Sequence, residues 1–250
     1  MIDLQETSLE YNGVSILDEV EMHIAEGQFV SLLGPSGCGK SSLLRLVAGL
    51  ERPSSGNVSI GGVPAERFRQ EQHEIALVFQ EPRLLPWRNV RKNIALPLEL
   101  SPVPTGKQQE LITASLDLIG LRAEDQRKYP RMLSGGMRMR VALARALVTE
   151  PNVLLLDEPF AALDDLLRQQ LNEELLRIWR QRSPTTLFVT HNISEAIFLS
   201  QRIVVMGSQP GRIKAEIEIP FEYPRESALR ATPEFGQFVG VVSAALRAEY

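Results

Sequence analysis

The sequence has a single cysteine, no excess of basic residues and no long apolar run. One cysteine, Cys38, cannot form a disulfide within the chain, which fits a reducing compartment. With 27 basic against 31 acidic residues, the net charge of −4 gives no support for nucleic-acid binding. No apolar stretch approaches the roughly 18 residues that a membrane-spanning helix needs, and the N-terminus, MIDLQETSLE, lacks the features of a signal peptide. We therefore expect a cytosolic protein, or one attached to the cytosolic face of a membrane.

The composition is that of a globular protein. The chain has 250 residues, of which 44% are hydrophobic and 23% charged, enough for one large α/β domain or two small subdomains with separate cores. Short apolar stretches with strand character alternate with helical stretches. This alternation predicts a mostly parallel sheet with right-handed crossovers.

A glycine-rich turn lies within residues 29–49, between a predicted apolar strand and a predicted helix. Its sequence, GPSGCGKS, matches the phosphate-loop pattern G-x-x-x-x-G-K-[ST]. An ordinary glycine turn would match by chance in under roughly 1% of such chains. Backbone N–H groups of such a loop converge on a phosphate at the positive end of the helix, while Lys40 bridges the β- and γ-phosphates and Ser41 binds Mg²⁺. The expected nucleotide-binding residues include Gly34, Pro35, Ser36, Gly37, Cys38, Gly39, Lys40, Ser41 and Ser42.

Polar residues follow the ends of several predicted strands. Besides the phosphate loop, these are Gln80, the pair Asp157 and Glu158, and His191. Ligands of parallel sheets bind at the carboxyl ends of the strands. Asp157 suits a Mg²⁺ site, and Glu158 suits a general base that deprotonates the attacking water. Helix capping or solvation in a loop is the alternative for the acidic pair, and Gln80 and His191 carry weight only through their positions.

The helical pattern changes after Gln80. Prolines at 82, 86, 97, 102 and 104 break the chain, and a helix is predicted over 106–120, which indicates a helical insertion. A second helix is predicted to open at residues 134–136 and to end before Pro151. A further helix is predicted over 164–182. The tail from Glu234 to Glu249 is predicted to be helical, and packing on its own domain is favoured over a partner surface.

Four motifs in order make the chain resemble the ATP-binding cassette family over nearly all of its length. They are GPSGCGKS, LSGGMRMRVALARAL from Leu133, VLLLDEP from Val153 and AALD from Ala161. Gln80 and His191 fall where the family has its Q-loop glutamine and switch histidine. Tyr11 matches the adenine-stacking aromatic residue, although a hairpin core aromatic is the alternative for it.

The resemblance implies an α/β fold with a P-loop NTPase core, a mostly parallel sheet, an antiparallel β subdomain and an inserted α-helical subdomain. We expect one domain over residues 1–250, divided into a β-rich and core part (1–80), a helical subdomain (about 81–150), a core return (151–220) and a C-terminal tail (221–250).

The resemblance also implies a role for each motif residue. Catalysis would use Glu158, His191 and Gln80, and Mg²⁺ would be held by Ser41, Gln80 and Asp157. Two chains would form a head-to-tail homodimer around two ATP molecules, because the helix N-terminus at the signature motif has no phosphate to bind within its own chain. The signature residues, acting on the partner's ATP, are Leu133, Ser134, Gly135, Gly136 and Met137, and Asp164 of the D-loop would contact the partner.

Three positions depart from common family members. Met137 stands where many carry glutamine, Met139 also replaces a frequent glutamine, and Ser42 replaces a threonine. Since Cys38 lies in the phosphate loop, we expect a thiol reagent to inhibit the protein and ATP to protect it.

The segment VFQEPRLLPWRNV from Val78, with DEPFAALD, resembles the nitrate, sulfonate and taurine importer branch. This implies an ATP-hydrolysing subunit at the cytoplasmic face, bound to transmembrane permease subunits and serving a solute-binding protein indirectly. The residues expected to contact the permease are Arg83, Leu84, Leu85, Pro86 and Trp87, with internal packing of this loop as the alternative. The alternative functions are a soluble cassette ATPase of DNA repair or translation, which would need coiled-coil insertions or two cassettes, and an exporter or lipid-transport ATPase.

Overall fold

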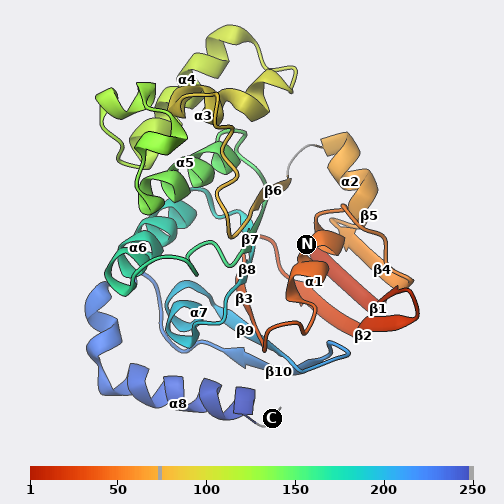
Figure 1. The fold of residues 1–250 in the computed structure, drawn as a ribbon. Coiled ribbons are helices and arrows are strands. Elements are labelled where there is room, and N and C mark those ends of the chain that lie inside the picture. Colours follow the sequence, from red (N-terminus) through yellow and green to blue (C-terminus); the bar gives the residue numbers. More distant parts are fainter. Residues whose placement is uncertain (73–74, 248–250) are drawn as a thin grey trace.

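The computed structural model describes residues 1–72 and 75–247, which form two sheets with helices around them (Figure 1). The smaller sheet is antiparallel, with the order β2-β1-β4-β5. Its strands are β1 (Ile2–Tyr11), β2 (Val14–Ile24), β4 (Ser55–Ile60) and β5 (Val63–Pro64). Asn12 and Gly13 close the β1–β2 hairpin with φ of 50° and 80°, a turn conformation that these two residue types favour.

The larger sheet has six strands in the order β10-β9-β3-β8-β7-β6. Its strands are β3 (Phe29–Leu33), β6 (Ile75–Val78), β7 (Val153–Asp157), β8 (Thr185–Val189), β9 (Arg202–Met206) and β10 (Ile213–Glu218). All neighbours pair in parallel except β10 with β9. Every residue of β3 and β8 is buried, as expected for parallel strands covered on both faces.

Different elements cover the two faces of this sheet. On one face, Val153 and Leu155 of β7 share a core with α1 (Lys40–Val47), with α2 (Ala65–Gln72) and with the antiparallel sheet. On the other face, Leu154 and Leu156 pack against α5 (Gly135–Leu147) and α6 (Asp165–Arg182). The arrangement has the predicted α/β class, with a mostly parallel sheet.

A third core belongs to helices that Figure 1 shows above the sheet. It joins α3 (Val90–Glu99), α4 (Thr105–Leu118) and α5, and two 3₁₀ turns (Ala123–Arg127 and Pro130–Met132) connect α4 to α5. The helix predicted over 106–120 is confirmed as α4. The prediction that Pro97 breaks the chain is wrong, because Pro97 lies inside α3. Its ring removes a backbone donor only near the helix end, while Ile94 and Leu98 bury the helix face in this core.

The C-terminal part packs on its own domain. After α7 (Ile193–Leu199) and β10, a 3₁₀ turn (Ser227–Ala231) leads into α8 (Pro233–Arg247). Phe235 and Val242 of α8 are buried against Ala196 and Ile197 of α7. The favoured interpretation of the tail is therefore confirmed up to Arg247, and the predicted continuation to Glu249 lies outside the described residues. Among those residues, no helix is both long and apolar enough to span a bilayer.

Candidate nucleotide-binding and catalytic site

The phosphate loop has a backbone that only glycine fits at three positions. Gly37 and Gly39 have φ of 82° and 94°, and a Cβ at Gly34 would lie 2.8 Å from the carbonyl oxygen of Met206. Gly39 is the N-cap of α1, and among the described residues no side chain caps that helix. The first N–H groups of α1 are therefore available to an anion, together with the positive end of the helix dipole.

Lys40 is turned into the loop. Its side chain is buried, at 6% exposure, and its Nζ donates hydrogen bonds to the carbonyl oxygens of Gly34 (2.9 Å) and Pro35 (2.8 Å). These carbonyls hold the ammonium group inside the curve of the loop. A phosphate entering the loop can take their place as the acceptor of a charge-assisted hydrogen bond.

Cys38 contributes its backbone and not its thiol. The residue is 1% exposed and belongs to the core between the two sheets. Burial raises the pKa of the Cys38 thiol, and the charge of Lys40 opposes this. The expectation that a thiol reagent inhibits the protein and that ATP protects it is not supported by this burial, because the reactive species is an accessible thiolate.

The turn between β9 and β10 packs against the phosphate loop. Gln209 Nε2 donates to the carbonyl oxygen of Gly37 (3.1 Å), and Gly211 N–H donates to that of Ile16 (2.8 Å). A Cβ at Gly211 would lie 2.1 Å from the carbonyl oxygen of Cys38. The sequence Gln-Pro-Gly is typical of a turn, but nothing in it indicates that this turn contacts the phosphate loop.

Ser41 and Asp157 meet at the edge of the large sheet. Ser41 Oγ donates to Asp157 Oδ1 at 3.0 Å, which joins the start of α1 to the end of β7. Burial raises the pKa of the Asp157 carboxyl, the hydrogen bond from Ser41 lowers it and the charge of Glu158 raises it. A hydroxyl and a carboxylate are hard oxygen ligands of the kind that Mg²⁺ prefers, so this pair fits the predicted metal site.

Gln80, the third predicted ligand, lies two residues beyond β6, which pairs in parallel with β7 (Val78 beside Leu156), so it is near the same edge of the sheet as Asp157. It follows β6, is exposed, and lines a cavity together with Gly135, Pro159 and Leu163. Its predicted role at the metal stays a prediction.

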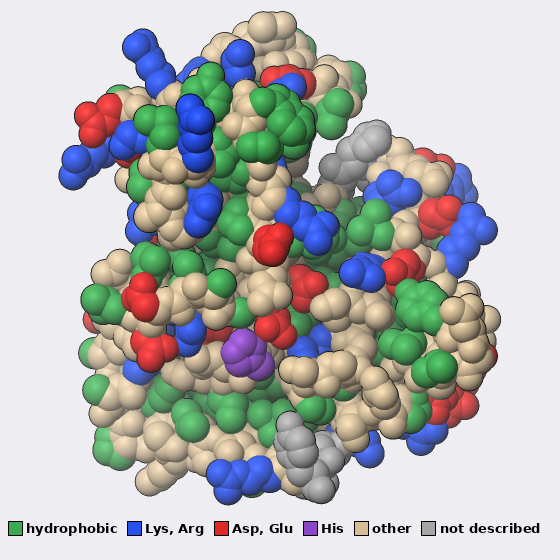
Figure 2. Space-filling view, viewed as in Figure 1, with side chains coloured by type: hydrophobic (Ala, Val, Ile, Leu, Met, Phe, Trp, Pro, Cys, Tyr) green, Lys and Arg blue, Asp and Glu red, His purple; other side chains and the backbone are tan. Residues whose placement is uncertain are grey.

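Glu158 and His191 form a second polar pair. Glu158 Oε2 lies 2.9 Å from His191 Nδ1, and the Glu158 N–H donates to the carbonyl oxygen of Val189 (3.0 Å). Glu158 has φ of 45°, a costly backbone conformation that often occurs at functional sites. The capping alternative is not supported, because Asp164 caps the next helix, α6, by accepting from Leu167 N–H (3.0 Å). Figure 2 shows acidic side chains and a histidine close together in the middle of this view of the molecule.

The signature residues form the start of α5. Ser134 Oγ accepts from the Met137 N–H at 3.2 Å, which makes Ser134 the N-cap, and Leu133 is buried. A Cβ at Gly136 would lie 2.7 Å from Leu167 of α6, so glycine permits close packing of the two helices. Met139 is buried in the core with α6, which accounts for an apolar residue where glutamine is frequent.

Tyr11 is not a core residue. It ends β1 with 43% of its surface exposed, and its hydroxyl donates to Glu51. Its exposed ring is free to stack on a flat ligand.

The predicted permease loop divides into a packed part and an exposed part. Leu84 packs against two of the cores, whereas Trp87 is 71% exposed. Asn93, fully buried, donates to the carbonyls of Leu85 (3.2 Å) and Arg88 (2.9 Å), and fixes the loop from α3. Internal packing thus explains Leu84 and leaves Trp87 unexplained. Asn93 was missed because buried asparagines have no sequence signature.

Comparison with known proteins identifies the family. Residues 17–161 match the ABC transporter family. The chain belongs to this family. The cassette is 44% identical over 225 residues to the nitrate import ATP-binding protein NrtD of Synechococcus elongatus, covering 88% of this chain and 81% of that protein. It is 45% identical over 218 residues to the aliphatic sulfonates import ATP-binding protein SsuB of Bacillus cereus, covering 87% and 84%.

Solved structures confirm the fold. The cassette superimposes with a TM-score of 0.78 on the dimeric post-hydrolysis state of the ATP-binding cassette MJ0796 bound to ADP and Pi. The two are 28% identical, and the match covers 89% of this chain and 100% of that one. The predicted family and fold class are confirmed, and the cassette is an ATP-binding ATPase of the ABC type.

Proposed function

We propose that this cassette is the ATP-hydrolysing subunit of a membrane importer for nitrate, a sulfonate, taurine or a similar small solute. It would act at the cytoplasmic face of the membrane with transmembrane permease subunits, and through them with a solute-binding protein. The names of the two importer relatives support this assignment. The observation that carries the chemistry is the meeting of Ser41 with Asp157, beside Glu158 and His191, at one edge of the parallel sheet.

Each group at this edge has a defined task in phosphoryl transfer to water. Ser41 and Asp157, with Gln80, would hold Mg²⁺, which neutralises charge on the phosphate oxygens when bound. Lys40 exchanges its carbonyl partners for phosphate oxygens. Glu158 orients the attacking water and accepts its proton, and His191 fixes the carboxylate in position.

The two helix N-termini suggest why two chains are needed. The α1 helix packs on one face of the large sheet and α5 on the other, so the signature residues of one chain do not lie against its own α1. A partner in head-to-tail orientation brings its Ser134 and Gly135 to the γ-phosphate, and its Asp164 to the interface. The similarity to a dimeric cassette supports this arrangement.

The test of this proposal is Glu158→Gln with Glu110→Gln, an exposed residue of α4, as control. Glu158→Gln is expected to bind ATP, to lower kcat about 10²–10⁴-fold, and to form an ATP-dependent dimer in light scattering, while Glu110→Gln matches the parent. Near-parent turnover would refute the role of Glu158. A variant that binds ATP and stays monomeric would refute the dimer.

The importer assignment is tested separately at the exposed loop. Trp87→Ala is expected to leave ATP hydrolysis by the purified protein intact and to deplete the protein from membranes of its own organism. Leu50→Ala, an exposed apolar residue near the antiparallel sheet, is the control. Equal membrane association of both variants would remove the docking role. Genes for a permease and a binding protein beside this gene, and growth on candidate nitrogen or sulfur sources, would then narrow the solute.

A further inference from the structure

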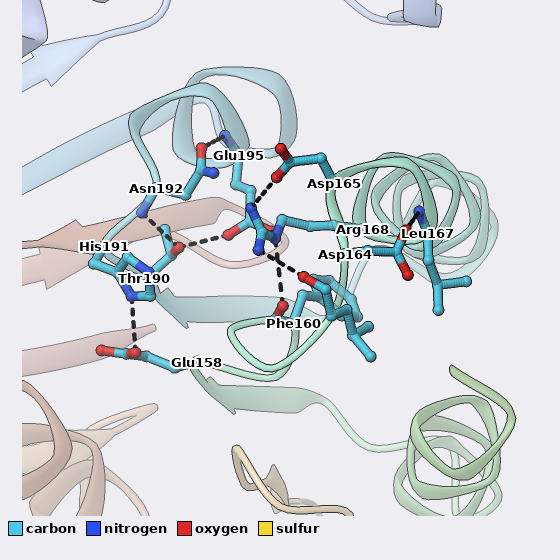
Figure 3. A network of polar contacts seen from close by, with 11 residues as sticks. Glu158, Phe160, Asp164, Asp165, Leu167, Arg168, Thr190, His191, Asn192 and Glu195 are labelled. Atoms are coloured by element: carbon cyan, nitrogen blue, oxygen red, sulfur yellow. Dashed lines mark hydrogen bonds and ion pairs between the residues drawn. The ribbon is translucent and has the colours of Figure 1, made fainter. Parts of the chain in front are cut away.

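Arg168, near the start of α6, donates hydrogen bonds to the backbone of the turn between β7 and α6 (Figure 3). Its Nη2 donates to the carbonyl oxygen of Leu163 (2.7 Å), and its Nε donates more weakly to that of Phe160 (3.4 Å). Its Nη1 bonds Asp165 at 2.8 Å. This turn, residues 160–165, includes the D-loop residue Asp164, and we call it the D-turn.

Glu195, in the first turn of α7, is hydrogen-bonded to the turn that contains His191. Its carboxylate is 6% exposed, and Oε2 accepts from Thr190 Oγ at 2.6 Å. Thr190 Oγ in turn accepts from the Asn192 N–H (3.0 Å), so both neighbours of His191 belong to one chain of hydrogen bonds. We call residues 190–192 the histidine turn.

An ion pair between Arg168 and Glu195 connects these two sets of hydrogen bonds. Arg168 Nε lies 3.8 Å from Glu195 Oε1. Burial raises the pKa of the Glu195 carboxyl, while the hydrogen bond from Thr190 and the charge of Arg168 lower it. Arg168 is thus within ion-pair distance of the buried Glu195 carboxylate.

Stability alone does not account for such a pair. Replacing a buried ion pair by neutral groups of similar size is often neutral or stabilising, because desolvation offsets the attraction. What the pair provides is a fixed geometry between two turns that come from different strand ends. The histidine turn in turn sets His191 Nδ1 against Glu158 Oε2.

We propose that Arg168 and Glu195 are positioning residues that link the D-turn to the histidine turn, so that the contact of His191 with Glu158 is held in place when the partner closes on Asp164. The inference rests on the proposed dimer. Contact at the D-turn moves the backbone held by Arg168, and the ion pair carries this displacement to the turn that holds His191.

The test is a double-mutant cycle in the full-length protein. Arg168→Met keeps the length of the side chain without its charge, and Glu195→Gln keeps an acceptor for Thr190. We expect each to lower kcat about tenfold with KM for ATP within about twofold, since coupling networks contribute on this scale. The double variant is expected to fall no further than either single variant, because the link is already lost. Arg180→Met, on the exposed side of α6, is the control.

The double variant also limits the risk of misfolding, because it removes both charges of the ion pair together. In the Glu158→Gln background it should still bind ATP and dimerise, a readout that a general loss of structure would not preserve. Parent-like kcat in the double variant, or single effects that add, would overturn the link. If the Glu158→Gln chain itself fails to dimerise with ATP, the proposed function fails instead, so the two failures are distinguishable.

Discussion

The N-termini of α1 and α5 share their chemistry and differ in their surroundings. Both helices start next to glycine, and their first turns, KSS and GGM, contain no acidic residue. An acidic side chain there would neutralise the positive end of the helix. Neither helix therefore neutralises its positive end with an acidic side chain in its own first turn.

Their surroundings separate them. The start of α1 is enclosed by its own chain, with Lys40 buried in the loop and the β9–β10 turn behind it. The start of α5 has an exposed Ser134, whose hydroxyl is used on Met137 N–H. In the proposed dimer, α1 is a site complete within one molecule, while α5 offers its end to another molecule. The following predictions test this difference, from the largest effect to the smallest.

Lys40→Ala should have the largest effect on nucleotide affinity. It removes a charge-assisted hydrogen bond of about 1.5–3 kcal/mol, which corresponds to a loss of roughly ten- to hundredfold. Titration with a fluorescent ATP analogue measures it, with the exposed Lys107→Ala as control. Unchanged affinity would show that the α1 site does not depend on its lysine.

Gly211→Ala should damage the same site from a distance. The added methyl group would meet the carbonyl oxygen of Cys38 at 2.1 Å, so the turn or the loop must move. Overpacking of this kind costs about 1–3 kcal/mol. We expect weaker ATP binding and a lower melting temperature, measured by the same titration and by calorimetry. Gly236→Ala, where a Cβ has open space, should leave affinity at the parent value.

Ser134→Ala should spare the α1 site and weaken the α5 site. Loss of an N-cap costs about 1 kcal/mol. In the Glu158→Gln background, we expect normal ATP affinity at low protein concentration and about fivefold weaker ATP-dependent dimerisation. The matched control is Asn89→Ala, which removes the N-cap of α3 in the same group of helices. Equal dimerisation of both variants would contradict the assignment of α5 to the partner.

Alkylation of Cys38 should be the smallest effect. Burial raises the pKa of its thiol, so little thiolate is present near neutral pH and the rate rises as the pH approaches that higher pKa. Mass spectrometry over time should show slow modification with and without ATP. Rapid modification that ATP prevents would place the thiol on the open side of the loop.

Sequence reasoning located those parts of the site whose chemistry is local. The phosphate loop, the end of β7 and the start of α5 each depend on a short run of residues that carries its own conformational requirement. Glycine at positions 37 and 39 is one example, and Ser134 as an N-cap is another. Fold class followed from the alternation of strands and helices.

Contacts between distant segments were not predictable in this way. Gln209 reaches Gly37 across most of the sequence, and Arg168 meets Glu195 from another helix. The pattern Asn192 to Glu195 indicates a helix cap, and the cap is present, but the glutamate turns to Thr190. Pro97 was misjudged because burial of one helix face outweighs the lost backbone bond.

Leu17 lies where three stretches of chain converge. A Cβ at Gly39 would touch it at 2.7 Å, and one at Gly211 at 3.1 Å. The conformation of the octapeptide GPSGCGKS therefore depends on packing against β2 and against the β9–β10 hairpin near residue 210. An amino-terminal fragment that contains the whole octapeptide but stops before this hairpin would have the motif without these packing contacts. We expect such a fragment to bind nucleoside triphosphates weakly.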